Sequence, residues 1–207
     1  MNIPFGYLMF QRKIPVLHGS AINLNNKGII FSGFSKTGKS SLLIELLKKG
    51  RMITEDVCKI KFIKNKPFIS KSFPFIKTDS LPFNFKGLGL MELENLLPDK
   101  RGRKYYYVKE KKMTQKSPLL INTLVILKWG NKIEMEAIDS SRAFKALFPH
   151  LFKTPLKNGR PIFKDKEFEL SSLSNLSDII SKVKIIEFTR PKFEKNDILI
   201  DYLEQNI

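Results

Sequence analysis

One segment in the first quarter of the chain constrains the fold more than any other. Residues 33–40 read Gly-Phe-Ser-Lys-Thr-Gly-Lys-Ser, which fits the pattern G-x-x-x-x-G-K-[ST], and they follow the apolar run 28–32. The next residues, 41–47, have apolar side chains at helical spacing, so the motif lies between a predicted strand and a predicted helix. In that context its backbone N–H groups and the helix N-terminus converge on an anion, which predicts a phosphate-binding loop.

The phosphate-binding motif also assigns roles to individual side chains. In such a loop the lysine reaches the outer phosphates of a nucleotide, and the hydroxyl that follows it binds Mg²⁺. Lys39 and Ser40 occupy these two positions, so we expect ATP and Mg²⁺ as ligands. The predicted nucleotide-binding residues are Gly33, Ser35, Lys36, Thr37, Gly38, Lys39, Ser40 and Ser41.

Length and composition are those of one globular domain. The 207 residues contain no Pro/Gly/Ser-rich linker, and 42% of them are apolar, which predicts a single domain over residues 1–207. Cys58 is the sole cysteine, so an intramolecular disulfide framework is excluded. No apolar run is long enough to span a membrane, and together these features predict a cytoplasmic protein.

The formal net charge of +17 raises the question of a nucleic-acid partner. Only seven of the 37 basic residues are arginine, the residue favoured for base and phosphate recognition, so nucleic acid is not the expected partner. The densest basic patch, residues 100–104, precedes three tyrosines at 105–107. Three interpretations of this patch stay open: a surface for single-stranded nucleic acid, a strand beside a solvated loop, or a loop that closes on phosphates.

The order of predicted elements favours an α/β fold with a mixed sheet and hairpins over a plain doubly wound parallel sheet. The apolar run 119–129 reads as a buried strand, and Gly130-Asn131 predicts a hairpin into 132–138. The other predicted elements are a helix at 39–49, a strand at 51–54, edge strands or hairpins in 57–75, helices at 88–97, 139–152 and 174–183, a strand at 184–188 and a helix at 196–205.

An acidic pair, Glu55-Asp56, follows the loop after only one helix and one short strand. A phosphate loop needs a carboxylate to help hold the metal, and a kinase needs one to accept the proton of the acceptor hydroxyl. In most ATPases and GTPases the acid instead ends a long apolar strand further along the chain. The obvious strand of that kind here, 119–127, ends without an acid.

In these features the chain resembles the catalytic domain of HPr kinase/phosphorylase and its short stand-alone relatives, whose phosphate-loop fold is shared with phosphoenolpyruvate carboxykinases. The resemblance begins with Leu17-His18-Gly19-Ser20-Ala21 and continues through the loop and helix at 28–47. It then includes Lys49-Gly50-Arg51-Met52-Ile53-Thr54-Glu55-Asp56-Val57 and, less specifically, Pro98-Asp99-Lys100-Arg101, 118–138 and 143–152.

The resemblance implies a kinase that transfers a phosphoryl group from ATP to a hydroxyl, such as a serine of a protein, a peptide or a small molecule. It implies that His18, Glu55 and Asp56 lie at the transferred phosphate, with Asp56 favoured as the base, and it allows a homo-oligomer. The predicted metal ligands are Ser40, Glu55 and Asp56. The basic residues that would close over the phosphoryl group are Lys100, Arg101 and Arg103.

Two departures from the family pattern keep other functions open. HPr kinases carry Glu directly after the loop serine and Asp as the first acid of the pair, whereas this chain has Ser41 and Glu55. HPr itself is therefore not the expected substrate, and a nucleotide-binding regulator with a degenerate site is one alternative. A nucleic-acid-associated ATPase, suggested by the net charge, is the other. His150 has no counterpart in the pattern, and we interpret it as a packing or capping residue.

Overall fold

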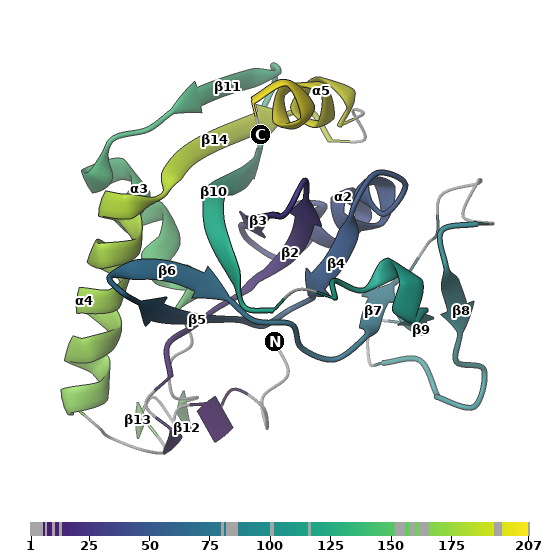
Figure 1. Cartoon of the computed structure of the whole chain (residues 1–207), viewed down its shortest axis with the longest axis horizontal. Coiled ribbons are helices and arrows are strands. Elements are labelled where there is room, and N and C mark those ends of the chain that lie inside the picture. The colour runs from purple at the N-terminus through teal and green to yellow at the C-terminus, as the bar shows by residue number, and fades with distance from the viewer. Residues whose placement is uncertain are drawn as a thin grey trace.

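The computed structural model describes residues 6, 8–9, 11–12, 14–79, 81, 87–99, 102–115, 117–151, 156–157, 160–161, 166–192 and 196–206. Among these residues, nine strands form one curled mixed sheet (Figure 1). Seven of them follow in the order β1 (Val16–Leu17), β5 (Cys58–Ile63), β6 (Lys66–Ile69), β10 (Leu119–Trp129), β3 (Lys27–Ser32), β2 (Gly19–Leu24) and β4 (Arg51–Thr54). The other two are β14 (Lys184–Arg190), which pairs with β10, and β11 (Glu134–Ala137), which pairs with β14. The predicted mixed α/β fold with hairpins is confirmed.

Two smaller sheets lie beside the main one. The first has the order β7 (Phe75–Thr78), β9 (Lys104–Val108) and β8 (Leu90–Glu92), and the second pairs β12 (Leu156–Lys157) with β13 (Arg160–Pro161). The described helices are α2 (Lys39–Leu46), α3 (Ser140–Leu147), α4 (Lys166–Lys182), α5 (Asp197–Asn206) and the short 3₁₀ turns η1 (Glu110–Lys112) and η2 (Phe148–His150). Within the described ranges, no helix is long and apolar enough to cross a bilayer.

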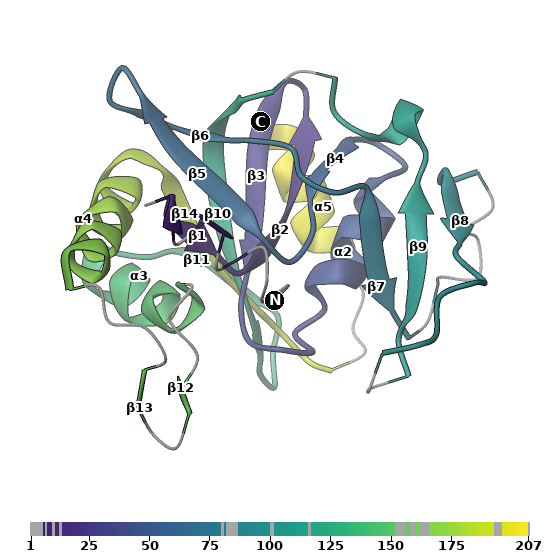
Figure 2. The same cartoon turned by 90° about the horizontal axis from the view of Figure 1, so that it is seen from below.

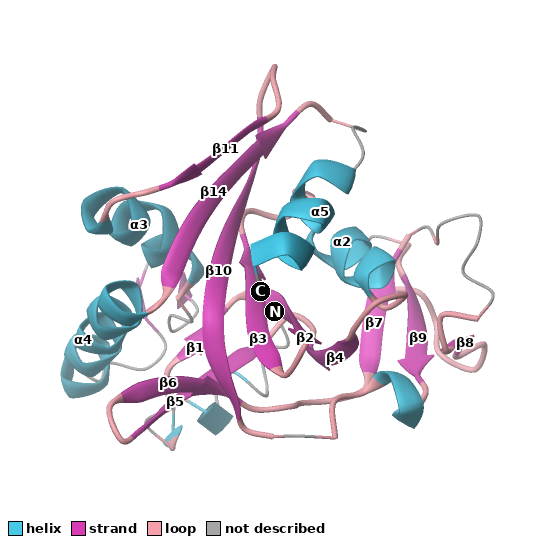
Figure 3. Cartoon of the chain, turned by 45° about the horizontal axis from the view of Figure 1, so that its top comes forward, coloured by secondary structure: helices cyan, strands magenta, loops and turns pink. Residues whose placement is uncertain are grey.

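Helices cover both faces of the central strands, as Figure 3 shows. Side chains that alternate along β3 and β10 divide between two apolar clusters, because successive residues of a strand point to opposite faces. Ile30 and Leu124 pack in the cluster that contains α3 and α4. Phe31 and Val125 pack in the cluster that contains α2 and α5. Burial on both faces explains why these strands read as continuous apolar runs.

The parallel arrangement of β3, β10 and β14 brings their C-terminal ends to one edge of the sheet. Ile126 of β10 is the register partner of Ser32, the last residue of β3, so β10 continues three residues past the end of β3. Trp129, at the end of β10, pairs in register with Arg190, at the end of β14. Ligands of open α/β sheets bind at this kind of edge.

The predicted hairpin between 119–129 and 132–138 is wrong. The chain does reverse after Gly130, but β14 lies between the two segments and pairs with both. The residues of β14 are mostly buried, whereas those of β11 are mostly exposed. The apolar strand therefore occupies the interior position, and the polar strand forms the edge of the sheet.

The predicted helix at 88–97 is also wrong, because β8 occupies the middle of this segment. Gly87 and Gly89 adopt positive φ angles of 95° and 71°, which do not suit a helix. Leu96 and Leu97, which we expected on the buried face, are 50% and 88% exposed. The other expected helices are present with shifted ends: α2 and α3 end earlier than predicted, and α4 begins earlier.

Candidate functional site

The phosphate-binding motif forms the connection between β3 and α2, as the sequence predicts. Gly33 and Gly38 have positive φ angles of 147° and 88°, and Gly38 is the N-cap residue of α2. A Cβ atom on Gly33 would lie 2.6 Å from the Leu127 carbonyl oxygen and 3.0 Å from the Thr37 hydroxyl. Glycine is therefore required at residue 33 both by the backbone conformation and by the close approach of β10.

We expect Gly33→Ala to lower the free energy of unfolding by about 1–3 kcal/mol, because it combines backbone strain with a steric clash. Urea unfolding would measure the loss. Gly87→Ala is the matched control, since Gly87 also has positive φ but a Cβ there would have no atom within 4 Å. Equal losses in the two variants would contradict the role of the β10 contact.

Lys39 is buried inside the loop, with only 8% of its surface exposed. Its Nζ donates hydrogen bonds to the carbonyl oxygens of Gly33 and Phe34, each over 2.8 Å. Burial lowers the pKa of Lys39, and the negative charges of Asp56 and Glu55 oppose this effect. The ammonium group is thus bonded to the loop backbone and lies within electrostatic range of the two acids.

The other predicted loop residues differ in burial. Thr37 donates from its hydroxyl to the Phe34 carbonyl oxygen over 2.8 Å and helps to close the loop. The side chains of Ser35 and Lys36 are exposed, and Lys36 has a φ of 70°. Ser41 lies exposed on the first turn of α2.

Ser40 connects the loop to the acidic pair. Its hydroxyl, on the first turn of α2, donates over 2.9 Å to Oε1 of Glu55, which directly follows β4. Burial, and after it the charge of Asp56, raises the pKa of Glu55 to about 7. A hydroxyl and a carboxylate in contact are oxygen ligands of the kind that Mg²⁺ prefers, and Mg²⁺ takes few ligands from protein when phosphates supply the rest. Among the described residues, no group of three or more His, Cys, Asp or Glu side chains is arranged to hold a metal ion.

Asp56 is surrounded by positive and polar groups. It has a φ of 70°, and its Oδ2 accepts a hydrogen bond from Lys77 Nζ over 3.1 Å. His18 Nδ1 donates to the Asp56 carbonyl oxygen over 3.1 Å and lies 3.5 Å from Asp56 Oδ1. Burial raises the pKa of Asp56, but neighbouring positive charges, Lys77 and His18 among them, outweigh burial and lower it. Asp56 is therefore ionised at neutral pH.

Of the three predicted basic residues, Arg103 is described, whereas Lys100 and Arg101 lie outside the described residues. Arg103 precedes β9, and its guanidinium donates through Nε and Nη2 to Asp99 Oδ2. Burial lowers the pKa of Arg103, but the Asp99 hydrogen bonds and the charges of Asp56 and Glu55 outweigh it and raise the pKa. Arg103 therefore lies within electrostatic range of the acidic pair.

The structure adds two residues to this site that the sequence patterns did not predict there. Lys77 comes from β7, which lies beside α2 (Figure 2), and no motif marks it in the sequence. His150 is buried, with its ring 4.9 Å from the ring of Phe34 in the phosphate loop, and its carbonyl oxygen accepts from the His18 N–H over 2.7 Å. The predicted packing role of His150 agrees with these contacts, but its place beside the loop is visible only in the fold.

We expect His150 to make folding sensitive to acid. Burial, and after it the positive charges of His18 and Lys39, lowers the pKa of His150 from 6.5 to about 4. Between these values the unfolded chain binds a proton that the folded chain does not, so the free energy of unfolding falls as pH falls from 6.5 to 4, by up to about 3 kcal/mol. Urea unfolding at several pH values would measure this slope in the wild type and in His150→Gln. An unchanged slope in the variant would contradict the assignment.

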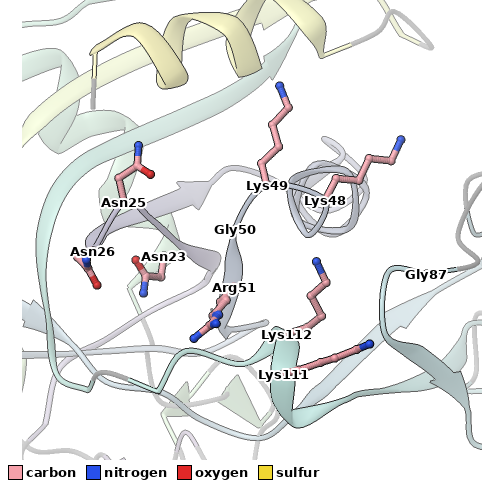
Figure 4. Close-up of a pocket in the computed structure, with 10 residues that line it drawn as sticks. All are labelled: Asn23, Asn25, Asn26, Lys48, Lys49, Gly50, Arg51, Gly87, Lys111 and Lys112. Atoms are coloured by element: carbon pink, nitrogen blue, oxygen red, sulfur yellow. The ribbon is translucent and has the colours of Figure 1, made fainter.

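A separate polar pocket of about 620 Å³ lies at the other end of α2. Figure 4 shows the cations around it, which come from the end of α2, the start of β4 and η1. Lys112 Nζ donates to the Leu47 carbonyl oxygen over 2.6 Å, and Lys49 pairs with Glu204. Cations at a helix C-terminus stabilise the helix, which accounts for part of this cluster. None of the residues that line the pocket belongs to the phosphate loop.

Comparison with known proteins finds relatives of the amino-acid sequence. No family model matches the chain. A Fusobacterium nucleatum protein named "Putative HPr kinase/phosphorylase" is 26% identical over 167 residues, which are 79% of this chain and 22% of that protein. The HPr kinase/phosphorylase of Clostridium beijerinckii is 36% identical over 81 residues, 39% of this chain and 26% of that protein. The chain thus spans about a quarter of the length of these curated relatives.

Among solved structures, the HPr(Ser) kinase/phosphatase from Coxiella burnetii aligns with a TM-score of 0.43 and 14% sequence identity, over 92% of this chain and 94% of that one. The sequence relatives agree with the resemblance carried by the loop, the acidic pair and His18. The chain is thus similar in sequence to HPr kinase/phosphorylases over part of their length.

Proposed function

We propose that this protein transfers a phosphoryl group from ATP to a hydroxyl, with Mg²⁺, and that the acceptor is a serine of a protein, a peptide or a small molecule. The observation that carries the proposal is the contact between Ser40 and Glu55, which brings the acidic pair to the end of the phosphate loop. The sequence similarity to HPr kinase/phosphorylases supports phosphoryl transfer as the reaction class. Since ATP and a single buried cysteine suit the cytoplasm, we expect the protein to act there.

The loop residues would bind and orient the nucleotide. Backbone N–H groups of residues 35–39 and the Lys39 ammonium would hold the β- and γ-phosphates. Ser40 and Glu55 would hold Mg²⁺, which neutralises charge on the phosphates when bound. Deprotonation of Glu55 would accompany this, because a metal ligand must be in its basic form.

Asp56 is our candidate for the base. Its carboxylate would accept the proton of the acceptor hydroxyl as the new O–P bond forms, while the bond between the γ-phosphorus and its bridging oxygen breaks and ADP leaves. Lys77 and His18 would orient Asp56 through the contacts described above. Arg103, held by Asp99 and within electrostatic range of both acids, would add positive charge near the transferred group.

A transfer screen tests the proposal. The protein is incubated with Mg²⁺ and ATP labelled at the γ-phosphate, together with serine-containing peptides, free serine or sugars, and the label in each acceptor is measured. We expect transfer to at least one serine hydroxyl in the wild type and about a thousandfold slower transfer in Lys39→Ala. Nucleotide binding without transfer to any acceptor would overturn the kinase proposal in favour of a regulatory nucleotide-binding protein. Hydrolysis stimulated by nucleic acid would favour the ATPase alternative.

A further inference from the structure

A tryptophan and an arginine lie against the second glycine of the phosphate loop, outside the residues assigned so far. Trp129 and Arg190 are register partners at the C-terminal ends of β10 and β14, at the sheet edge that carries the loop. A Cβ atom on Gly38 would lie 2.6 Å from Arg190 Nη2 and 3.9 Å from Trp129 Cη2. The loop backbone thus packs directly against both side chains.

The two side chains differ in exposure. Arg190 is 4% exposed, and its Cζ lies 4.4 Å from the centroid of the Trp129 ring, a cation–π contact. The Gly130 N–H donates to the Arg190 carbonyl oxygen over 3.0 Å and ties the end of β10 to β14. Trp129 remains 36% exposed although it is the last residue of a strand that is mostly buried. Arg190 therefore fixes the indole in one orientation while part of the ring stays open to solvent.

We propose that Trp129, held by Arg190, is the surface on which the base of the bound nucleotide stacks. This inference rests on the nucleotide binding of the proposed function. With its phosphates in the loop at 33–40, a nucleotide must place its ribose and base beside the loop, and Trp129 is an exposed aromatic residue against Gly38. Stacking on an indole contributes binding free energy without hydrogen bonds to the edge of the base, so it does not distinguish one base from another. The ligand class is therefore a nucleotide with little selection for its base, so ADP and GDP should bind with similar affinity.

Trp129 is the only tryptophan of the chain, so its fluorescence reports on its own surroundings. We expect ADP to quench the tryptophan emission of the wild-type protein. Pyrophosphate, which lacks a base, should bind without comparable quenching. By calorimetry, Trp129→Leu should weaken ADP binding about 10-fold and leave pyrophosphate binding unchanged. Trp129→Phe, which keeps an aromatic face and guards against misfolding of the leucine variant, should recover part of the loss.

Phe75→Leu is the matched control, because Phe75 is 39% exposed on a different sheet. Equal losses of ADP and pyrophosphate affinity in Trp129→Leu would overturn the proposal, since they would mean that Trp129 only supports the loop. Unchanged ADP affinity would overturn it as well. Base stacking with no phosphoryl transfer would leave this inference intact and reject the kinase reaction alone, so the two failures are distinguishable.

Discussion

Lys39→Ala is expected to lower the rate of phosphoryl transfer by about three orders of magnitude, the scale found when a charged group that stabilises the transferring phosphoryl is removed. The reason is geometric. The Lys39 ammonium lies within the loop, bonded to the Gly33 and Phe34 carbonyl oxygens, and no other described lysine makes these contacts. Transfer of labelled phosphate under saturating ATP would measure the effect.

Lys48→Ala is the control for Lys39→Ala, because Lys48 is an exposed lysine just beyond the other end of the same helix. It should keep the wild-type rate. Urea unfolding of both variants would show whether Lys39→Ala remains folded, since the truncation also removes two buried hydrogen bonds. A folded Lys39→Ala protein with the wild-type transfer rate would contradict the role of the loop.

Asp56→Asn is expected to lower the transfer rate by about 10²- to 10⁴-fold while ATP still binds, because the amide cannot accept the hydroxyl proton. The substitution keeps the backbone carbonyl that accepts from His18 and keeps the shape of the side chain. Asp79→Asn, a change of the same kind at an exposed aspartate near the end of β7, should have no effect. Full activity of Asp56→Asn would remove the base assignment.

Glu55→Gln separates the roles of the two acids. If Glu55 holds Mg²⁺ with Ser40, its loss should raise the Mg²⁺ concentration needed for half-maximal transfer, and excess Mg²⁺ should restore part of the rate. The rate of Asp56→Asn should stay low at every Mg²⁺ concentration. The reverse pattern would exchange the assignments of the two carboxylates.

The features predicted well from the sequence are those in which neighbouring residues decide the structure. The strand, loop and helix at 27–46 form because two glycines permit the turn and apolar side chains on both sides are buried at once. Asp139 caps α3 through the Arg142 N–H, a contact within four residues. The strand at 119–129 has the predicted bounds because it is apolar on both faces.

The predictions that failed depended on distant partners. The turn at Gly130 correctly reverses the chain, but only the packing of the whole sheet places β14 between β10 and β11. The apolar residues in 88–97 fit a helical face, yet β9 offers a strand partner and two glycines adopt conformations foreign to a helix. In both cases the pairing with a strand far along the chain outweighed the local pattern.

By itself, the sequence determined that residues 33–40 form a glycine-containing loop between a strand and a helix and that an acidic pair follows soon after. Those features depend on residue types at short spacing. Only the tertiary structure decided which side chains surround them: Lys77 beside Asp56, His150 beside Phe34, and Trp129 with Arg190 against Gly38. These residues come from separate strands and turns that tertiary packing brings to the loop and the acidic pair. Packing between segments far apart in the sequence leaves no mark in local spacing.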